Sequence, residues 1–149
     1  MAYQDLNSII HDLFSYDQEC LHRLKKAVGD LPDKRQRIKG EMIVRQMKHD
    51  LQELEPYEQH GDAHPEQIKE VPDMELQHCI PNFSRNPKQF DEYYRSIIAY
   101  YKRTTTFLER LRRLVKYDRS RDICDALIHF RTGQIQNFQN VLTQSELAT

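Results

Sequence analysis

The sequence predicts an all-α fold, an antiparallel bundle of four helices built as two hairpins. Apolar residues recur at intervals of three and four in four separate segments, which is the pattern of amphipathic helices. The 149 residues include only four glycines, and 30% of them are charged, a composition that favours helices with charged outer faces. Five of the six prolines fall within residues 56–88, between the second and third of these segments.

Each helix has its own signals in the sequence. The segment GDLPD, residues 29–33, ends the first helix with a glycine and starts the second after a proline, which closes the first hairpin. A short turn at residues 118–121 closes the second hairpin. We therefore expect one domain covering residues 1–149, with helices at residues 5–28, 34–55, 88–117 and 122–145.

Residues 56–87 are predicted to form a long crossover loop between the two hairpins. Pro56 should end the second helix, because a proline inside a helix removes a hydrogen bond and clashes with the preceding turn. A connection this long needs a topological reason, and a bundle whose second and third helices run parallel supplies one. The crossover carries His60, His64, His78 and Cys79, whose spacing matches no strong zinc signature.

Composition excludes several functional classes. The net charge of −1 gives no overall attraction to nucleic acid or to a membrane surface. No apolar run approaches the roughly 18 residues that a membrane span needs, and the N-terminus has no signal-peptide pattern. The three cysteines are odd in number and widely spaced, which argues against a disulfide framework. We expect a cytoplasmic protein that binds neither nucleic acid nor membrane.

The two hairpins carry a short internal repeat. Residues 21–28 (LHRLKKAV) align with residues 108–115 (LERLRRLV) at an offset of 87, with four of the eight positions identical. The same offset places residues 49–54 over residues 136–141 without a gap. This pattern indicates a duplicated helical hairpin, although helical periodicity alone produces some similarity.

With two related hairpins and one long crossover, the chain resembles the ferritin-like superfamily, in particular rubrerythrin-type four-helix bundles. The resemblance covers nearly the whole chain. It implies an inward Glu on the first helix of each hairpin and an inward Glu-x-x-His on the second, which together hold a pair of metal ions. The resemblance also implies iron or manganese as the cofactor.

Helical phase, at about 100° per residue, decides which residues occupy those inward positions. Glu19 and His22 have the Glu-x-x-His spacing, but their phase turns both toward solvent. The inward positions carry side chains that are mostly poor metal donors, so the phase predicts a buried polar layer in place of a metal centre. The layer comprises Asp17 and Thr104 on the first helices of the two hairpins, Asp50 (next to Met47) on the second helix, and Gln134 and Asn137 on the fourth.

Three functional hypotheses follow. The first is a ferritin-like bundle with a degenerate metal centre, acting as a non-catalytic structural, interaction or stress-associated protein. The second is a divergent di-metal or mononuclear bundle that binds iron or manganese, as an oxidoreductase or an iron-binding protein, through Asp17, Asp50, His129 and Glu41. The third is a module that binds a small ligand in its polar core. No nucleophile–base constellation is present, so no catalytic residue is assigned.

The surface of the third helix suggests a partner. Its tyrosines are expected to divide between the core (Tyr94 and Tyr101) and the rim (Tyr93 and Tyr100). A rim of tyrosine beside arginine is typical of subunit contacts. We therefore expect a homodimer or another protein partner.

Overall fold

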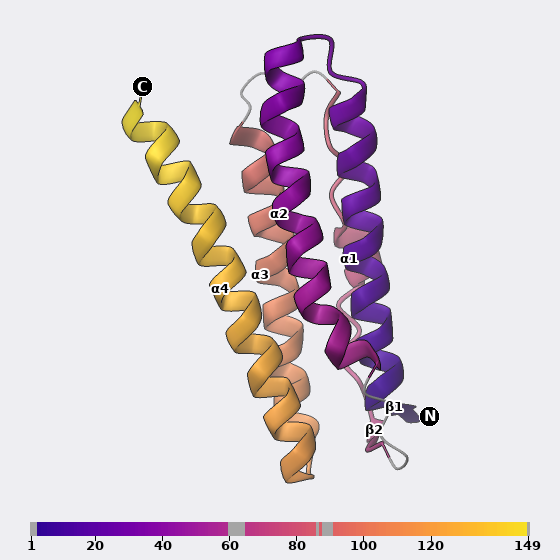
Figure 1. The fold of residues 1–149 in the computed structure, drawn as a ribbon. Coiled ribbons are helices and arrows are strands. Elements are labelled where there is room, and N and C mark those ends of the chain that lie inside the picture. Colours follow the sequence, from indigo (N-terminus) through magenta and orange to yellow (C-terminus); the bar gives the residue numbers. More distant parts are fainter. Residues whose placement is uncertain (1–2, 60–64, 86, 88–90, 149) are drawn as a thin grey trace.

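In a computed structural model, which describes residues 3–59, 65–85, 87 and 91–148, the chain forms four long helices. These are α1 (Leu6–Gly29), α2 (Lys34–Gln59), α3 (Asp91–Leu114) and α4 (Asp118–Ala148). They are arranged as two antiparallel hairpins, because α1 packs chiefly on α2 and α3 on α4 (Figure 1). The prediction of an all-α protein built on four helices is confirmed at this level.

A small sheet, which the sequence did not predict, adds to the helices. Strand β1 (Tyr3–Asp5) pairs antiparallel with β2 (Gln67–Lys69), with Gln4 opposite Ile68. Ile68 is buried, so the strand pair places an apolar side chain of the crossover into the core. Asp5 then caps α1, because its carboxylate accepts a hydrogen bond from the backbone N–H of Ser8 at 2.7 Å.

The predicted end of the second helix at Pro56 differs from the structure. α2 continues through Pro56 to Gln59, and it bends near this end (Figure 1). A proline removes one hydrogen bond of the helix ladder and displaces the preceding turn, which kinks a helix without necessarily ending it.

The turn between α3 and α4 also lies elsewhere than predicted. α3 ends at Leu114 and α4 begins at Asp118, so the chain reverses three or four residues earlier than expected. Glu66, from the crossover, accepts hydrogen bonds from the backbone N–H groups of Lys116 at 2.8 Å and Tyr117 at 2.9 Å. A buried carboxylate therefore stabilises the turn from fifty residues away in the sequence.

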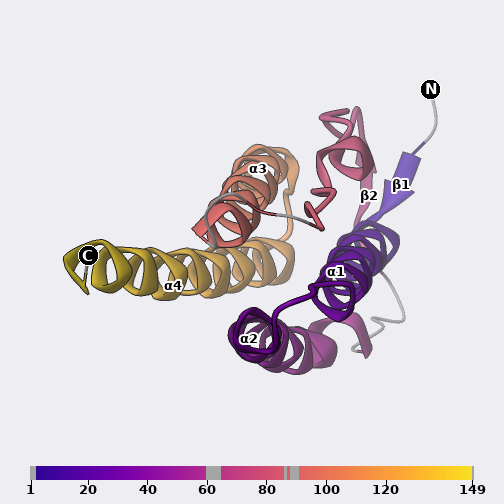
Figure 2. The same ribbon diagram turned by 90° about the horizontal axis from the view of Figure 1, so that it is seen from above.

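The crossover lies along α1 and α3, on the side away from α2 and α4 (Figure 2). It contains one short 3₁₀ helix, η1 (Leu76–Cys79), which packs on α3. Arg23 of α1 holds the crossover through hydrogen bonds to the carbonyl oxygen of Ile80 and the side chain of Asn82. The predicted start of the third helix at residue 88 lies outside the described residues, as do His60 and His64.

The apolar core forms two clusters, one toward each end of the bundle. The first cluster, near the turn between α1 and α2, includes Leu24 and Ile43. The second cluster, near the turn between α3 and α4, includes Leu54 and Leu111. No helix in the described part of the chain is both long and apolar enough to cross a membrane.

Candidate functional site

A polar level separates the two apolar clusters on every helix. On α1, Asp17 lies between Leu13 of one cluster and Cys20 of the other. The same change of cluster occurs around Asp50 on α2 and around Thr104 on α3. On α4 two buried residues, Arg131 and Gln134, lie between Leu127 and Phe138. The sequence therefore predicted the level correctly at four positions, and it missed Arg131.

An ion pair lies at the centre of this level. Nη2 of Arg131 donates to Oδ2 of Asp17 at 2.6 Å, and both side chains are at most 7% exposed. Tyr100 on α3 donates its hydroxyl to the other carboxylate oxygen of Asp17 at 2.7 Å. The guanidinium of Arg131 also lies over the ring of Tyr101, 4.2 Å from its centroid, in a cation–π contact. One arginine thus joins α1, α3 and α4.

A second carboxylate extends the level to α2. Tyr101 donates its hydroxyl to Oδ2 of Asp50 at 3.2 Å, and Gln46 donates to Oδ1 at 3.1 Å. Both partners are neutral, and Asp50 makes no ion pair with any described side chain. The two buried carboxylates therefore differ, because Asp17 has a cation bound to it, whereas Asp50 makes hydrogen bonds to neutral groups and is influenced by the charge of Arg131 without an ion pair.

The remaining members of the predicted layer differ in their burial and in their hydrogen bonds. Thr104 is fully buried, and its hydroxyl donates to the carbonyl oxygen of Tyr101 at 2.8 Å within the helix. Gln134 is 4% exposed, yet its amide oxygen accepts no hydrogen bond from the described residues. Asn137 was predicted to be buried and is exposed, because α4 diverges from α2 toward its C-terminus (Figure 1).

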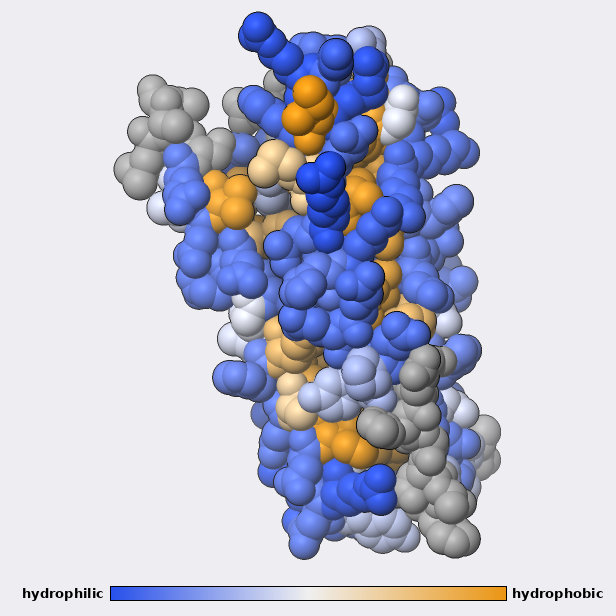
Figure 3. All heavy atoms as spheres, in the orientation of Figure 1, coloured by the Kyte–Doolittle hydropathy of each residue, from blue (hydrophilic) through white to orange (hydrophobic). Residues whose placement is uncertain are grey.

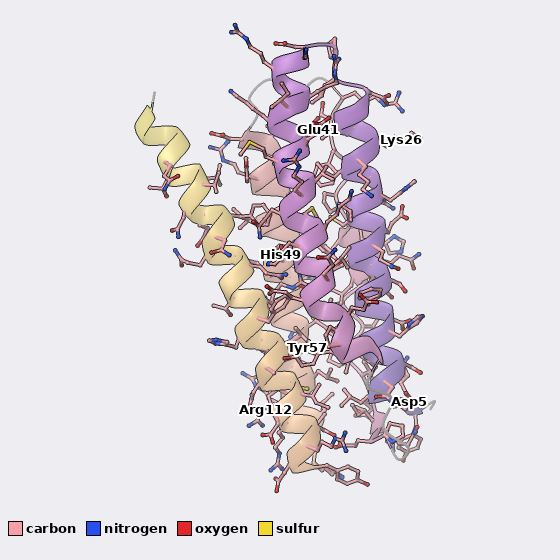
Figure 4. The ribbon with its side chains drawn as sticks, in the orientation of Figure 1. Asp5, Lys26, Glu41, His49, Tyr57 and Arg112 are labelled. Atoms are coloured by element: carbon pink, nitrogen blue, oxygen red, sulfur yellow. The ribbon has the colours of Figure 1, made fainter. Side chains whose placement is uncertain are left out.

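The four residues of the metal-binding hypothesis do not form one cluster: Asp50 and His129 line one groove between α2 and α4, but Asp17 lies in the core and Glu41 lies outside that groove. Glu41 and His129 are exposed, so neither faces Asp17 in the core, and Figure 4 shows Glu41 well along α2 from His49. On α2 and α4 the buried residues lie on a helix face that does not include Glu41 or His129. Glu19 and His22 are exposed as their phase predicts, and Glu19 pairs with Arg23 on the surface.

Electrostatics distinguish the two carboxylates further. Burial is the largest influence on Asp50 and raises the pKa of its carboxyl group, and the hydrogen bonds from Gln46 and Tyr101 offset that rise only in part. For Arg131, burial alone would lower the pKa of the guanidinium, but Asp17, Tyr101 and Tyr100 together more than compensate and the pKa is raised. Arg131 is therefore a permanent buried cation.

This arrangement does not fit the paired metal ions that the resemblance implies. Both oxygens of Asp17 already accept hydrogen bonds, one of them from a cation that would repel a metal ion. Threonine and glutamine supply the next side chains of the level, and both are weak donors for iron or manganese. Within residues 3–59, 65–85, 87 and 91–148, no three His, Cys, Asp or Glu side chains are placed to hold a metal ion.

The three cysteines are free thiols. Burial raises the pKa of Cys20, and it raises the pKa of Cys124 to about 11. Both side chains are therefore protonated at neutral pH, which makes them poor nucleophiles.

A groove runs beside the polar level between α2 and α4. It has a volume of about 440 Å³, and Asp50 and Gln134 reach it from the core. His49, labelled in Figure 4, lies at the rim of the groove and pairs with Glu53 at 2.8 Å. Figure 3 shows this side of the molecule as mainly hydrophilic, with smaller hydrophobic patches between the helices.

Fold and site together define a four-helix protein with a buried ion pair at its centre. The chain matches no protein-family model and no curated protein. Among solved structures it is similar to CopM in the apo form, at 16% identity and a TM-score of 0.48, over 93% of this chain and 96% of that one. CopM in the Ag-bound form, obtained by soaking, gives 16% identity and a TM-score of 0.49 over 97% and 98%. Similarity at this level assigns neither a family nor a function.

Proposed function

We propose that this protein is a ferritin-like bundle with a degenerate metal centre, which acts as a non-catalytic structural, interaction or stress-associated protein. One observation carries the proposal: Arg131 lies 2.6 Å from the carboxylate of Asp17, which is a position where the resemblance implies a metal ligand. The two hairpins and the crossover between α2 and α3 support the ferritin-like assignment.

In this proposal the buried arginine supplies the positive charge that a metal ion would otherwise supply. A buried carboxylate costs several kcal/mol unless a cation or hydrogen bonds compensate its charge. Arg131 supplies that cation for Asp17, and Tyr100 supplies a hydrogen bond to its second oxygen. The chain therefore carries its own cation where a metal centre would need an external one.

The alternative of a metal-binding oxidoreductase or iron-binding protein needs Asp17 to exchange Arg131 for iron or manganese. Elemental analysis of the protein, purified without added metal, tests this directly. We expect iron, manganese and zinc far below one equivalent per chain, in the wild type and in Asp17→Ala alike. Near-stoichiometric metal that is lost in Asp17→Ala would overturn the proposal and establish the alternative.

If the protein binds a small ligand, the groove between α2 and α4 offers more room for it than the axis of the bundle does. The cavity lined by Arg131 in the core has a volume of about 10 Å³, enough for a single water molecule at most. The groove between α2 and α4, which is open to solvent and lined by Asp50 and Gln134 of the polar level, has room for a larger ligand.

Self-association or a protein partner forms part of the proposal. Ile38 and Met42 lie one turn apart on α2, and they are 52% and 61% exposed. Exposed apolar neighbours on one helix face favour a protein contact. Light scattering after size-exclusion chromatography should give a dimer that Met42→Lys weakens, with Lys48→Met as a control elsewhere on α2. A monomer at all concentrations would contradict self-association.

A further inference from the structure

The groove between α2 and α4 has the features of a binding site that the ion pair does not use. It opens where α4 diverges from α2, and its volume of about 440 Å³ matches a small molecule (Figure 1). Its lining is polar except for Phe130 and Gly133. The polar side chains come from both helices: Gln46, His49, Asp50, Glu53, His129, Gln134 and Asn137.

One buried hydrogen-bond acceptor in the lining of this groove has no partner among the described residues. Gln134 is 4% exposed, and its amide oxygen has no partner among the described residues. A buried polar group without a partner costs about 1–3 kcal/mol, so an occupant that donates a hydrogen bond would recover that loss. Gln134 therefore favours a ligand that carries N–H or O–H donors.

Asp50 adds a requirement for charge. Its side chain is 5% exposed and lines the groove, yet its two partners, Gln46 and Tyr101, are neutral. Asp17 has Arg131 bound to it as a cation. Arg131 and His49 influence Asp50 only through their charge, without an ion pair, so a cation in the groove would give Asp50 the direct contact that Arg131 gives Asp17. Glu53 at the rim would attract a cation and repel an anion.

Gly133 keeps the groove open. A glycine within a helix costs about 1 kcal/mol relative to alanine. Gly40 on α2 has a packing reason, because an added Cβ would lie 2.6 Å from a methyl group of Val28. No packing contact requires a glycine at position 133, because an added Cβ would meet nothing within 4 Å. The missing side chain leaves room over the floor of the groove, where Phe130 offers an aromatic ring.

From these contacts we infer that the groove between α2 and α4 binds a small organic cation with an ammonium or guanidinium group. The cation donates to the carboxylate of Asp50 and to the amide oxygen of Gln134, and its aliphatic part lies over Gly133 and Phe130. An anion is disfavoured by the two carboxyl groups of the lining. A purely apolar ligand would leave Asp50 and Gln134 uncompensated.

Calorimetric titration with 1,4-diaminobutane and with ethylguanidinium tests the inference, with propionate as the anionic comparison. At least one cation should bind saturably at one site, and propionate should not. Asp50→Asn removes the charge at constant volume, and Gly133→Leu fills the groove. Each should weaken binding at least tenfold. Glu41→Gln removes an exposed carboxylate from the same helix, outside the groove, and should leave binding unchanged.

Three results would overturn the inference. The first is no saturation by either cation up to about 10 mM, far above the range of specific affinities. The second is equal weakening in Glu41→Gln, which would indicate unspecific attraction. The third is obtained on the wild type alone, so that it does not depend on the variants folding. Backbone amide shifts on titration should centre on residues 46–53 and 129–137, and shifts centred elsewhere would place the cation at another site.

Discussion

Replacing Arg131 by methionine should remove the cation of the central ion pair while it keeps most of the side chain's volume. The carboxylate of Asp17 then stays buried, with only the hydroxyl of Tyr100 as a partner. Breaking a buried pair in this way costs about 3–5 kcal/mol. The lost contact with the ring of Tyr101 adds about 1 kcal/mol.

A second route to the magnitude gives a similar value. Removing one partner of a buried hydrogen-bonded charge pair costs about 2–5 kcal/mol at protein interfaces as well, largely because the other charge stays buried and unpaired.

Urea unfolding followed by circular dichroism at 222 nm measures the free energy of unfolding of the wild type and of Arg131→Met. Arg121→Met is the matched control, since Arg121 lies on the same helix with its side chain 42% exposed, and it should change stability by less than about 0.5 kcal/mol. The double variant Asp17→Asn/Arg131→Met should be less destabilised than the two single costs added together. The reasoning is refuted if Arg131→Met costs no more than the control, or if the single costs add within about 0.5 kcal/mol.

Three further predictions concern other residues. Burial raises the pKa of Asp50 in the folded state, so the free energy of unfolding falls as the pH rises from the pKa of the unfolded chain to that of the folded protein. The variant Asp50→Asn should therefore be more stable than the wild type at pH 7 and as stable as the wild type near pH 4. A variant less stable than the wild type at pH 7 would contradict this. Gly133→Ala should raise the free energy of unfolding by about 1 kcal/mol, whereas Gly40→Ala should lower it by about 1 kcal/mol because the new Cβ crowds Val28. Equal effects of the two substitutions in urea unfolding would contradict the packing role of Gly40 and the open space at Gly133. Glu66→Ala should cost about 3 kcal/mol in the same assay, because two backbone N–H groups lose a charged acceptor, and a cost below about 0.5 kcal/mol would show that the turn does not need it.

Helical periodicity predicted the helices and most of the polar level. Asp17 and Thr104 were placed inward because a repeat of three and four residues fixes which face of a helix is buried. The same phase places Arg131 on the buried face of α4, four residues after Leu127 and three before Gln134. It was missed because arginine is rarely fully buried unless it is paired, and its partner lies on another helix.

Other differences have tertiary causes that periodicity does not contain. Tyr93 and Tyr100 were expected at the rim and are buried. Tyr93 lies against the crossover, where its ring contacts Phe83 edge-on and its hydroxyl donates to the carbonyl oxygen of Ser84. A face of α3 that would be exposed in an isolated bundle is therefore covered. The turn stabilised by Glu66 is a second case, because no local signal connects residues fifty positions apart.

We propose that Arg131 and Asp17 together replace a metal centre, and a metal-loading experiment tests this proposal most directly. The free energy of unfolding is measured with ferrous iron or with manganese in excess, and again with a chelator. We expect the same free energy of unfolding under all three conditions. A metal bound to the folded state at a hundred times its Kd would add about 2.7 kcal/mol. A stabilisation of that size by either metal, absent in Asp17→Ala, would contradict the account.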